Sequence, residues 1–166
     1  MKPEILFVLP PYVNRSSAVF EQYLGTAYIQ AYLQKFGIHT ESFIRKRPGT
    51  IPEIVMDVLS RNPKRVGFTC YDTNYYFVKI LAQAIKERNH NVMILVGGPT
   101  ATVSDEIILK DCSAIDICFR GEAEQSVQQF LALWKKEPHR ISGISYRDKG
   151  KIVRTPIKEL ASSGVK

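Results

Sequence analysis

The sequence predicts an α/β fold: a flavodoxin-like (Rossmann-like) sheet of five parallel strands in the order 2-1-3-4-5, followed by a C-terminal β-hairpin. Two observations predict this fold. Short apolar runs alternate five times with stretches whose apolar residues recur at helical spacing. The chain also has 166 residues, 45% of them hydrophobic, which suits one domain with a real core better than an eight-stranded barrel.

The first strand is predicted at residues 5–9, because five consecutive apolar residues are typical of a strand buried on both faces. Two prolines end this run. Residues 17–36 follow with apolar side chains at helical spacing, and Gly37 supplies a helix stop. Residues 38–44 then alternate like a half-buried strand, which completes the first βα unit and begins the second.

The middle of the chain repeats this alternation. Residues 51–59 carry an apolar stripe behind a proline of the first helical turn, and an Asn-Pro pair ends the helix. Residues 65–71 are predicted as the third strand, 77–85 as the buried face of the third helix and 92–96 as the fourth strand. Residues 97–99, Gly-Gly-Pro, break the chain abruptly.

The last unit consists of a short helix near residues 103–110, a fifth strand at 114–119 and a helix whose apolar face spans 127–134. Two further strands, at 141–146 and 151–154, flank an Asp-Lys-Gly turn and predict the hairpin. We find no internal repeat and no low-complexity tract.

The composition argues against several classes of protein. The net charge is +7, but nine of the 23 basic and only three of the 16 acidic residues lie from Lys135 onward, so the basic character belongs to the tail. A nucleic-acid partner is therefore not expected. No apolar run is long enough to cross a membrane and the N-terminus is unlike a signal peptide, which predicts a cytoplasmic protein without membrane contact.

Candidate catalytic and metal-binding side chains are scarce. The three cysteines lack metal-site spacing and lie in or beside apolar segments, so they are expected to be small buried hydrophobes. The three histidines fall outside the loops that follow the strands. We therefore expect no catalytic residue and no protein-ligated metal from these six residues, which are Cys70, Cys112, Cys118, His39, His90 and His139.

The loops after the strands carry the functional signal, because ligands of open α/β sheets bind beyond the carboxyl ends of the strands. These loops lie at residues 10–17, 70–75, 97–102 and 120–124. Gly97 and Gly98 would let a ligand approach the backbone, and hydroxyls near a helix N-terminus suit a phosphate or an amide-rich ligand. The alternative is a tight turn with Thr102 or Ser104 as the helix cap.

Several segments form an ordered set that covers nearly the whole chain. They are Pro-Pro-Tyr at 10–12, LGTAYIQAYL at 24–33, VGFTC at 66–70, AIKER at 84–88, VGGPTAT at 96–102, RGEAE at 120–124, GISYR at 143–147 and KIVR at 151–154. This set resembles the N-terminal cobalamin (B12)-binding domain of B12-dependent radical SAM proteins, the group of the class B methylases and the anaerobic Mg-protoporphyrin ester cyclases.

The resemblance implies a cobalamin site. The corrin would lie over the strand ends, and its nucleotide tail would enter the crevice between the sheet and the helices. The residues that the resemblance assigns to this site are Gly97, Gly98 and Thr100 along the tail, Thr69 as a hydrogen-bond donor, Tyr71, Thr73, Asn74 and Tyr75 below the corrin, Pro11, Tyr12, Leu24 and Gly25 on the opposite wall, and Gly121 and Glu122 at the far rim.

The chain departs from methionine-synthase-like domains, whose D-x-H-x-x-G loop after the first strand supplies a histidine to cobalt. Its loop at 10–17 has no histidine, so the resemblance implies a lower cobalt face without one, which suits a more reducible cobalt and radical methyl transfer. The radical SAM motif C-x3-C-x2-C is also absent. S-adenosylmethionine and a [4Fe-4S] cluster would therefore belong only to a longer parent protein, a methyltransferase or cyclase.

We accordingly expect three parts: a cobalamin-binding domain at 1–137, an appended hairpin at 138–156 and a linker at 157–166 toward a radical SAM barrel of the same parent chain. Two alternatives stay open at this point. One is a stand-alone flavodoxin-like domain that binds a nucleotide or flavin through Gly97 and Gly98. The other is a structural remnant that keeps the fold and holds no cofactor.

Overall fold

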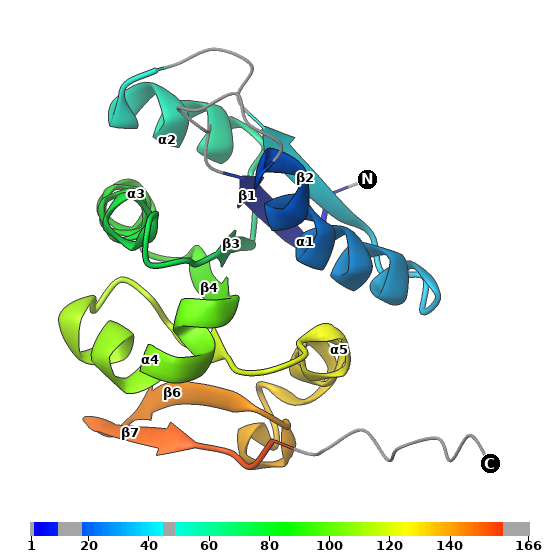
Figure 1. Cartoon of the computed structure of the whole chain (residues 1–166). Coiled ribbons are helices and arrows are strands. Elements are labelled where there is room, and N and C mark those ends of the chain that lie inside the picture. The colour runs from blue at the N-terminus through cyan, green and yellow to red at the C-terminus, as the bar shows by residue number, and fades with distance from the viewer. Residues whose placement is uncertain (1, 10–17, 45–48, 158–166) are drawn as a thin grey trace.

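The computed structural model describes residues 2–9, 18–44 and 49–157, except for the side chains of residues 18–23. The described strands form one sheet in the order β2-β1-β3-β4-β5-β6-β7 (Figure 1). Their bounds are β1 (Ile5–Leu9), β2 (Thr40–Ile44), β3 (Arg65–Thr69), β4 (Met93–Gly97), β5 (Ile117–Phe119), β6 (Ile144–Asp148) and β7 (Lys151–Arg154). Strands β1 to β5 pair in parallel, which confirms the predicted order 2-1-3-4-5.

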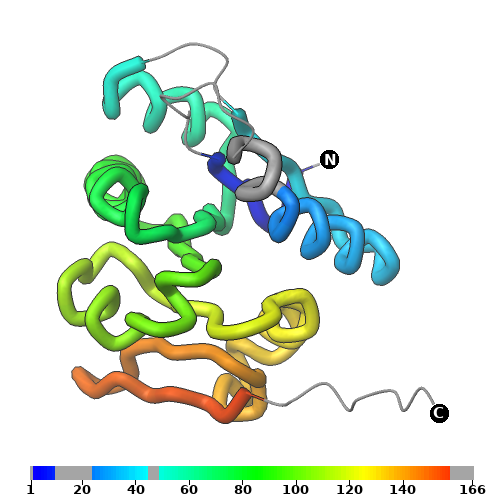
Figure 2. The backbone as a smooth tube through the Cα atoms, in the orientation of Figure 1, coloured from blue at the N-terminus to red at the C-terminus, as the bar shows by residue number. Residues whose placement is uncertain are grey.

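Helices cover both faces of this sheet. They are α1 (Ala18–Gln34), α2 (Ile51–Ser60), α3 (Tyr75–Arg88), α4 (Pro99–Asp111) and α5 (Glu124–Leu133), with a 3-10 turn at Pro138–Arg140. Helices α2, α3 and α4 pack on one face, and α1 and α5 on the other (Figure 2). Strand β1 is buried along its whole length, as its unbroken apolar run predicted. No described helix is long and apolar enough to cross a membrane.

The structure confirms the predicted hairpin and shows that its two strands extend the parallel sheet. Strand β6 pairs antiparallel with β5, and β7 pairs antiparallel with β6. Strand β6 starts at Ile144, three residues later than the pattern predicted, because Gly143 turns the chain at a φ of +63°. Because β7 thus runs in the direction of β5, Thr155, Pro156 and Ile157 lie at the edge where the parallel strands end.

Helix α4 begins four residues earlier than predicted. Gly98 is its N-cap at a φ of +99° and Pro99 occupies the first helical position, where the missing amide hydrogen costs nothing. Gly-Gly-Pro thus forms a tight turn from strand to helix, as the alternative interpretation had it, but the helix cap that this alternative placed at Thr102 or Ser104 is wrong. Ser104 instead marks a kink inside the helix, with a φ of −126°. The turn after β4 is consequently short, and it sets the start of α4 directly against β3 and β4.

Candidate cofactor site

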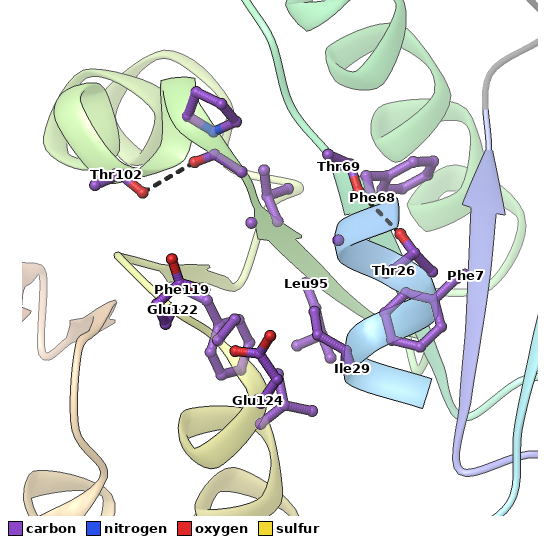
Figure 3. Close-up of a pocket in the computed structure, with 18 of the residues that line it drawn as sticks. Phe7, Thr26, Ile29, Phe68, Thr69, Leu95, Thr102, Phe119, Glu122 and Glu124 are labelled. Atoms are coloured by element: carbon purple, nitrogen blue, oxygen red, sulfur yellow. Dashed lines mark hydrogen bonds between the residues drawn. The ribbon is translucent and has the colours of Figure 1, made fainter. Parts of the chain in front are cut away.

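A cleft of about 470 Å³ opens between α1 and α5 and reaches the carboxyl ends of β3, β4 and β5 (Figure 3). Its volume lies within the range of about 300–1,000 Å³ that is usual for small-molecule sites. The floor is apolar and consists of strand residues that share one face of the sheet. These residues are Ile5, Phe7, Gly67, Leu95 and Phe119.

Three glycines shape this cleft in different ways. A Cβ at Gly67 would lie 2.8 Å from the Phe7 ring, so any larger residue at this position would displace Phe7 from its place in the floor. A Cβ at Gly97 would meet nothing closer than 3.9 Å, and one at Gly25 nothing within 4 Å. The space beside Gly25 and Gly97 is thus unfilled, and it faces the cleft from α1 and from β4.

Gly98 has a different role from Gly97. Its positive φ is strained for any other residue, and a Cβ there would lie 2.9 Å from the carbonyl oxygen of Cys70. Gly98 is therefore required by the turn itself, whereas Gly97 leaves room for a ligand.

Two hydroxyls meet in the wall of the cleft where α1 contacts the end of β3. The Oγ1 atoms of Thr26 on α1 and Thr69 at the end of β3 lie 3.2 Å apart and share a hydrogen bond (Figure 3). Thr26 is only 2% exposed. Because a hydroxyl both donates and accepts, each of the two could also bond to a polar atom of a ligand in the cleft.

Seven of the fourteen residues assigned to the site by resemblance line this cleft. They are Gly25, Thr69, Tyr71, Gly97, Gly98, Gly121 and Glu122. Five others lie near the same edge of the sheet without lining it, namely Leu24, Thr73, Asn74, Tyr75 and Thr100. Pro11 and Tyr12 lie outside the described residues.

Hydrogen bonds within the protein occupy three of the five residues that do not line the cleft. The Asn74 side chain accepts from the Tyr71 amide and donates to the Thr69 carbonyl, so it braces the turn after β3. The Tyr75 hydroxyl donates to Asp111 at 2.6 Å, and burial followed by this bond raises the pKa of Tyr75. The Thr100 hydroxyl donates to Asp72 at 2.7 Å.

The start of α4 offers little to a phosphate. The Thr100 amide donates to the Cys70 carbonyl, and the Thr102 amide donates to the Gly98 carbonyl. The Thr102 hydroxyl also donates to the Gly98 carbonyl and accepts from the Gly121 amide, at 3.0 Å each. These hydrogen bonds tie the loop after β4 to the loop after β5. They occupy the amides and hydroxyls that would have to donate to a phosphate at this helix start.

The three cysteines are buried and unpaired, as expected. Burial is the main cause that raises the pKa of Cys70 to about 12, and Asp72 adds to it. Burial, followed by Asp105, likewise raises the pKa of Cys118 to about 12. Both thiols are therefore protonated near neutral pH, which argues against Cys70 as a nucleophile at the end of β3.

These two thiols predict a loss of stability in alkali. A thiol with a pKa of 9.0 when unfolded and about 12 when folded stabilises the fold fully below pH 9. As pH rises between the two values, each thiol should remove up to about 1.4 kcal/mol of unfolding free energy per pH unit. Urea unfolding near pH 8 and pH 10 should show a steeper loss for the wild type than for Cys70→Ala. Equal losses would contradict the prediction.

Sequence reasoning missed the apolar floor and Thr26. Phe7, Gly67 and Leu95 alternate with residues of the opposite face, so strand periodicity could have grouped them on one side of the sheet. The pattern could not show that the space above them is open. The cleft lining contains no histidine, and the described residues contain no group of three metal-ligating side chains.

The fold and the cleft define a doubly wound α/β domain with a ligand site beyond the carboxyl ends of its strands. The chain belongs to the B12-binding domain family, whose model, described as a B12 binding domain, matches residues 12–131. The family prediction is thereby confirmed.

Two curated relatives are longer proteins. An uncharacterized methyltransferase of Pyrococcus horikoshii is 29% identical over 167 residues, which cover 95% of this chain and 35% of that protein. The anaerobic magnesium-protoporphyrin IX monomethyl ester cyclase of Rubrivivax gelatinosus is 25% identical over 162 residues, which cover 92% of this chain and 29% of the cyclase. The chain thus spans about a third of the length of these relatives.

Proposed function

We propose that this chain carries cobalamin for a B12-dependent radical SAM enzyme and holds it without a histidine below the cobalt. The observation that carries the proposal is the open, apolar cleft between α1 and α5, into which Gly25 and Gly97 project no side chain. A cradle that a Cβ would fill, at the switch point of a B12-binding fold, suits the nucleotide tail of cobalamin.

The residues of the cleft fit such a tail chemically. Phe7, Leu95 and Phe119 offer apolar contact to an aromatic base, and the hydroxyls of Thr26 and Thr69 offer the hydrogen bond that a base nitrogen needs. Tyr71 and Gly98 stand where the cleft opens at the strand ends. Pro11, Tyr12, Leu24, Thr73, Asn74, Tyr75 and Thr100 remain proposed neighbours of the corrin or tail beyond the cleft lining.

The proposal that no histidine ligates the cobalt is argued from all three histidines of the sequence. The chain has three histidines, and none lines the cleft. His39 lies directly before β2, and His90 and His139 are exposed outside the loops after the parallel strands. When bound, cobalamin would supply a reducible cobalt as a methyl carrier. The protein's part is to bind the tail, orient the corrin edge and leave the lower position without imidazole.

The reaction itself would belong to the rest of a longer protein. The two relatives are named as a methyltransferase and a cyclase, and this chain matches about a third of each. Its three cysteines are buried and do not form the C-x3-C-x2-C motif. S-adenosylmethionine and a [4Fe-4S] cluster are accordingly proposed only for a radical SAM barrel that follows residues 157–166.

Titration with hydroxocobalamin tests the proposal. The purified chain should bind it saturably, with an absorption spectrum in which no nitrogen ligates the cobalt from below. After reduction to Co(II), the electron paramagnetic resonance spectrum should lack nitrogen superhyperfine splitting. Thr69→Val should weaken binding about 2- to 10-fold, as expected for one lost hydrogen bond of about 0.5–1.5 kcal/mol.

Two nucleotides serve as comparison ligands in the same titration. Flavin mononucleotide and ADP should not bind, because the described lining of the cleft carries two glutamates and no lysine or arginine. Binding of either nucleotide in preference to hydroxocobalamin would overturn the proposal, and so would a nitrogen-ligated cobalt or a failure of the folded chain to bind any of the three.

A further inference from the structure

Two carboxylates stand in the wall of a cleft whose other described lining residues are uncharged. Glu122 precedes α5 and Glu124 lies in its first turn, and Figure 3 shows both among the side chains that surround the cleft. Within the described part of the chain no ion pair or hydrogen bond holds either side chain, and no cation lines the cleft. The described wall therefore presents two negative charges whose acceptor oxygens are available to a ligand.

The loop that presents Glu122 is held by the fold. Arg120 is 7% exposed, its guanidinium donates to the Thr155 carbonyl, and its amide donates to the Gly143 carbonyl at 2.7 Å. The next amide, of Gly121, donates to the Thr102 hydroxyl. Glu122 thus follows two residues that are bonded to α4 and to the hairpin, so its backbone position is fixed before any ligand binds.

The Arg120 guanidinium does not neutralise these glutamates. It is directed toward the hairpin, where the Ile144 and Thr155 carbonyls accept from it, and its Nε lies 3.5 Å from a carboxylate oxygen of Asp105. The positive charge of Arg120 is thereby paired with Asp105 and with backbone carbonyls of the hairpin. Glu124 also stabilises α5 electrostatically, because it lies in the first turn of the helix. This structural role does not distinguish one ligand from another.

We propose that Glu122 and Glu124 select corrinoids by the charge of their side chains: they accept hydrogen bonds from neutral carboxamides of the corrin and reject corrinoids in which such a group is a carboxylate. The inference rests on the proposed function, since it requires a corrin at this rim. Ionised carboxylates are acceptors only, so an amide N–H satisfies them, whereas a second carboxylate can only repel them.

The test uses hydroxocobalamin and the three monocarboxylic acids obtained by hydrolysing single propionamides of its corrin. The wild-type chain should bind at least one acid about tenfold or more less tightly than hydroxocobalamin. Glu122→Gln or Glu124→Gln should reduce this ratio of dissociation constants at least about fivefold, because glutamine can also donate to a carboxylate. The acids that lie away from the rim act as internal controls.

Glu137→Gln is the matched control variant, because Glu137 is paired with Arg140 outside the cleft lining and its loss should leave every ratio unchanged. If hydroxocobalamin binds but neither glutamine variant changes any ratio, the selection hypothesis is wrong and the cobalamin function stands. If the folded chain binds neither hydroxocobalamin nor any acid, both proposals fail. If Glu124→Gln only destabilised α5, it would weaken the binding of all corrinoids equally and leave every ratio unchanged, which would contradict selection by Glu124.

Discussion

Replacing Gly97 with tryptophan is expected to abolish cobalamin binding and to leave the fold intact. The Cβ of a residue at this position would have 3.9 Å of clearance, and the backbone has no positive φ to maintain. An indole attached there would extend into the cleft that Phe7, Leu95 and Phe119 form. Because the side chain and the nucleotide tail would need the same space, the dissociation constant for hydroxocobalamin should rise about a hundredfold or more.

Two comparison variants separate exclusion of the ligand from damage to the protein. Gln83→Trp places the same indole on an exposed position of α3 and should leave binding unchanged. Gly98→Trp should lower the thermal midpoint as well as binding, because its Cβ would contact the Cys70 carbonyl and its φ is +99°. Circular dichroism would monitor folding of all three. Binding by a folded Gly97→Trp variant with wild-type affinity would place the ligand elsewhere.

The sequence predicts the sheet well because the signals for it are local. The apolar run of β1 and the alternation of strands with helices indicate the doubly wound class, and a common strand order of that class is the one observed for the five parallel strands. Boundaries that depend on tertiary contacts were less accurate. The start of α4 is set by Gly98 against the Cys70 carbonyl, a contact between the residues that directly follow β4 and β3, and no local pattern contains it.

The location of the site follows from topology, but its interior does not. The rule that ligands bind beyond the carboxyl ends of parallel strands selects loops that line the cleft, through Gly97, Thr69 and Gly121. Residues such as Phe7 and Leu95 have the pattern of ordinary core residues. They line a cleft only because glycines at 25 and 97, on different elements, leave the space above them unfilled.

The role of the hairpin was also underestimated. The turn between β6 and β7 is evident from the sequence, whereas the pairing of β6 with β5 is not. That pairing brings Gly143 and Thr155 against Arg120, so the hairpin supports the loop that forms one rim of the cleft. The hairpin therefore supports the cleft although it lies beyond residues 12–131, which the B12-binding family model matches.

The buried carboxylate of Asp105 leads to the second large expected effect. Asp105 is 2% exposed, accepts from the Ser145 hydroxyl at 2.5 Å and from Arg154 Nε at 2.9 Å, and lies 3.5 Å from Arg120 Nε. Burial lowers the pKa of Arg120, and Asp105 opposes that shift. Asp105→Ala should reduce the unfolding free energy by about 3–5 kcal/mol, because it leaves the buried guanidinium without its counter-charge.

Urea unfolding measures this effect as a lower midpoint with an unchanged slope. The neighbouring Glu106 provides the control, because its exposed ion pairs, with Lys110 at 3.3 Å and with Arg154 at 3.6 Å, should make Glu106→Ala cost less than about 1 kcal/mol. A loss no larger than that of the control would contradict the prediction.

A double variant identifies the origin of the cost. In Asp105→Leu with Arg120→Met, neither buried charge remains, so much of the lost stability should return if the cost of Asp105→Ala arises from an unpaired guanidinium. Arg120 also donates to the Thr155 and Ile144 carbonyls. In the double variant the Thr155 carbonyl loses this donor, whereas the Ile144 carbonyl still accepts from the Thr155 amide and hydroxyl. Recovery should therefore be partial. No recovery would show that the hydrogen bonds to the hairpin, rather than the charge pair, hold α4, β5 and the hairpin together.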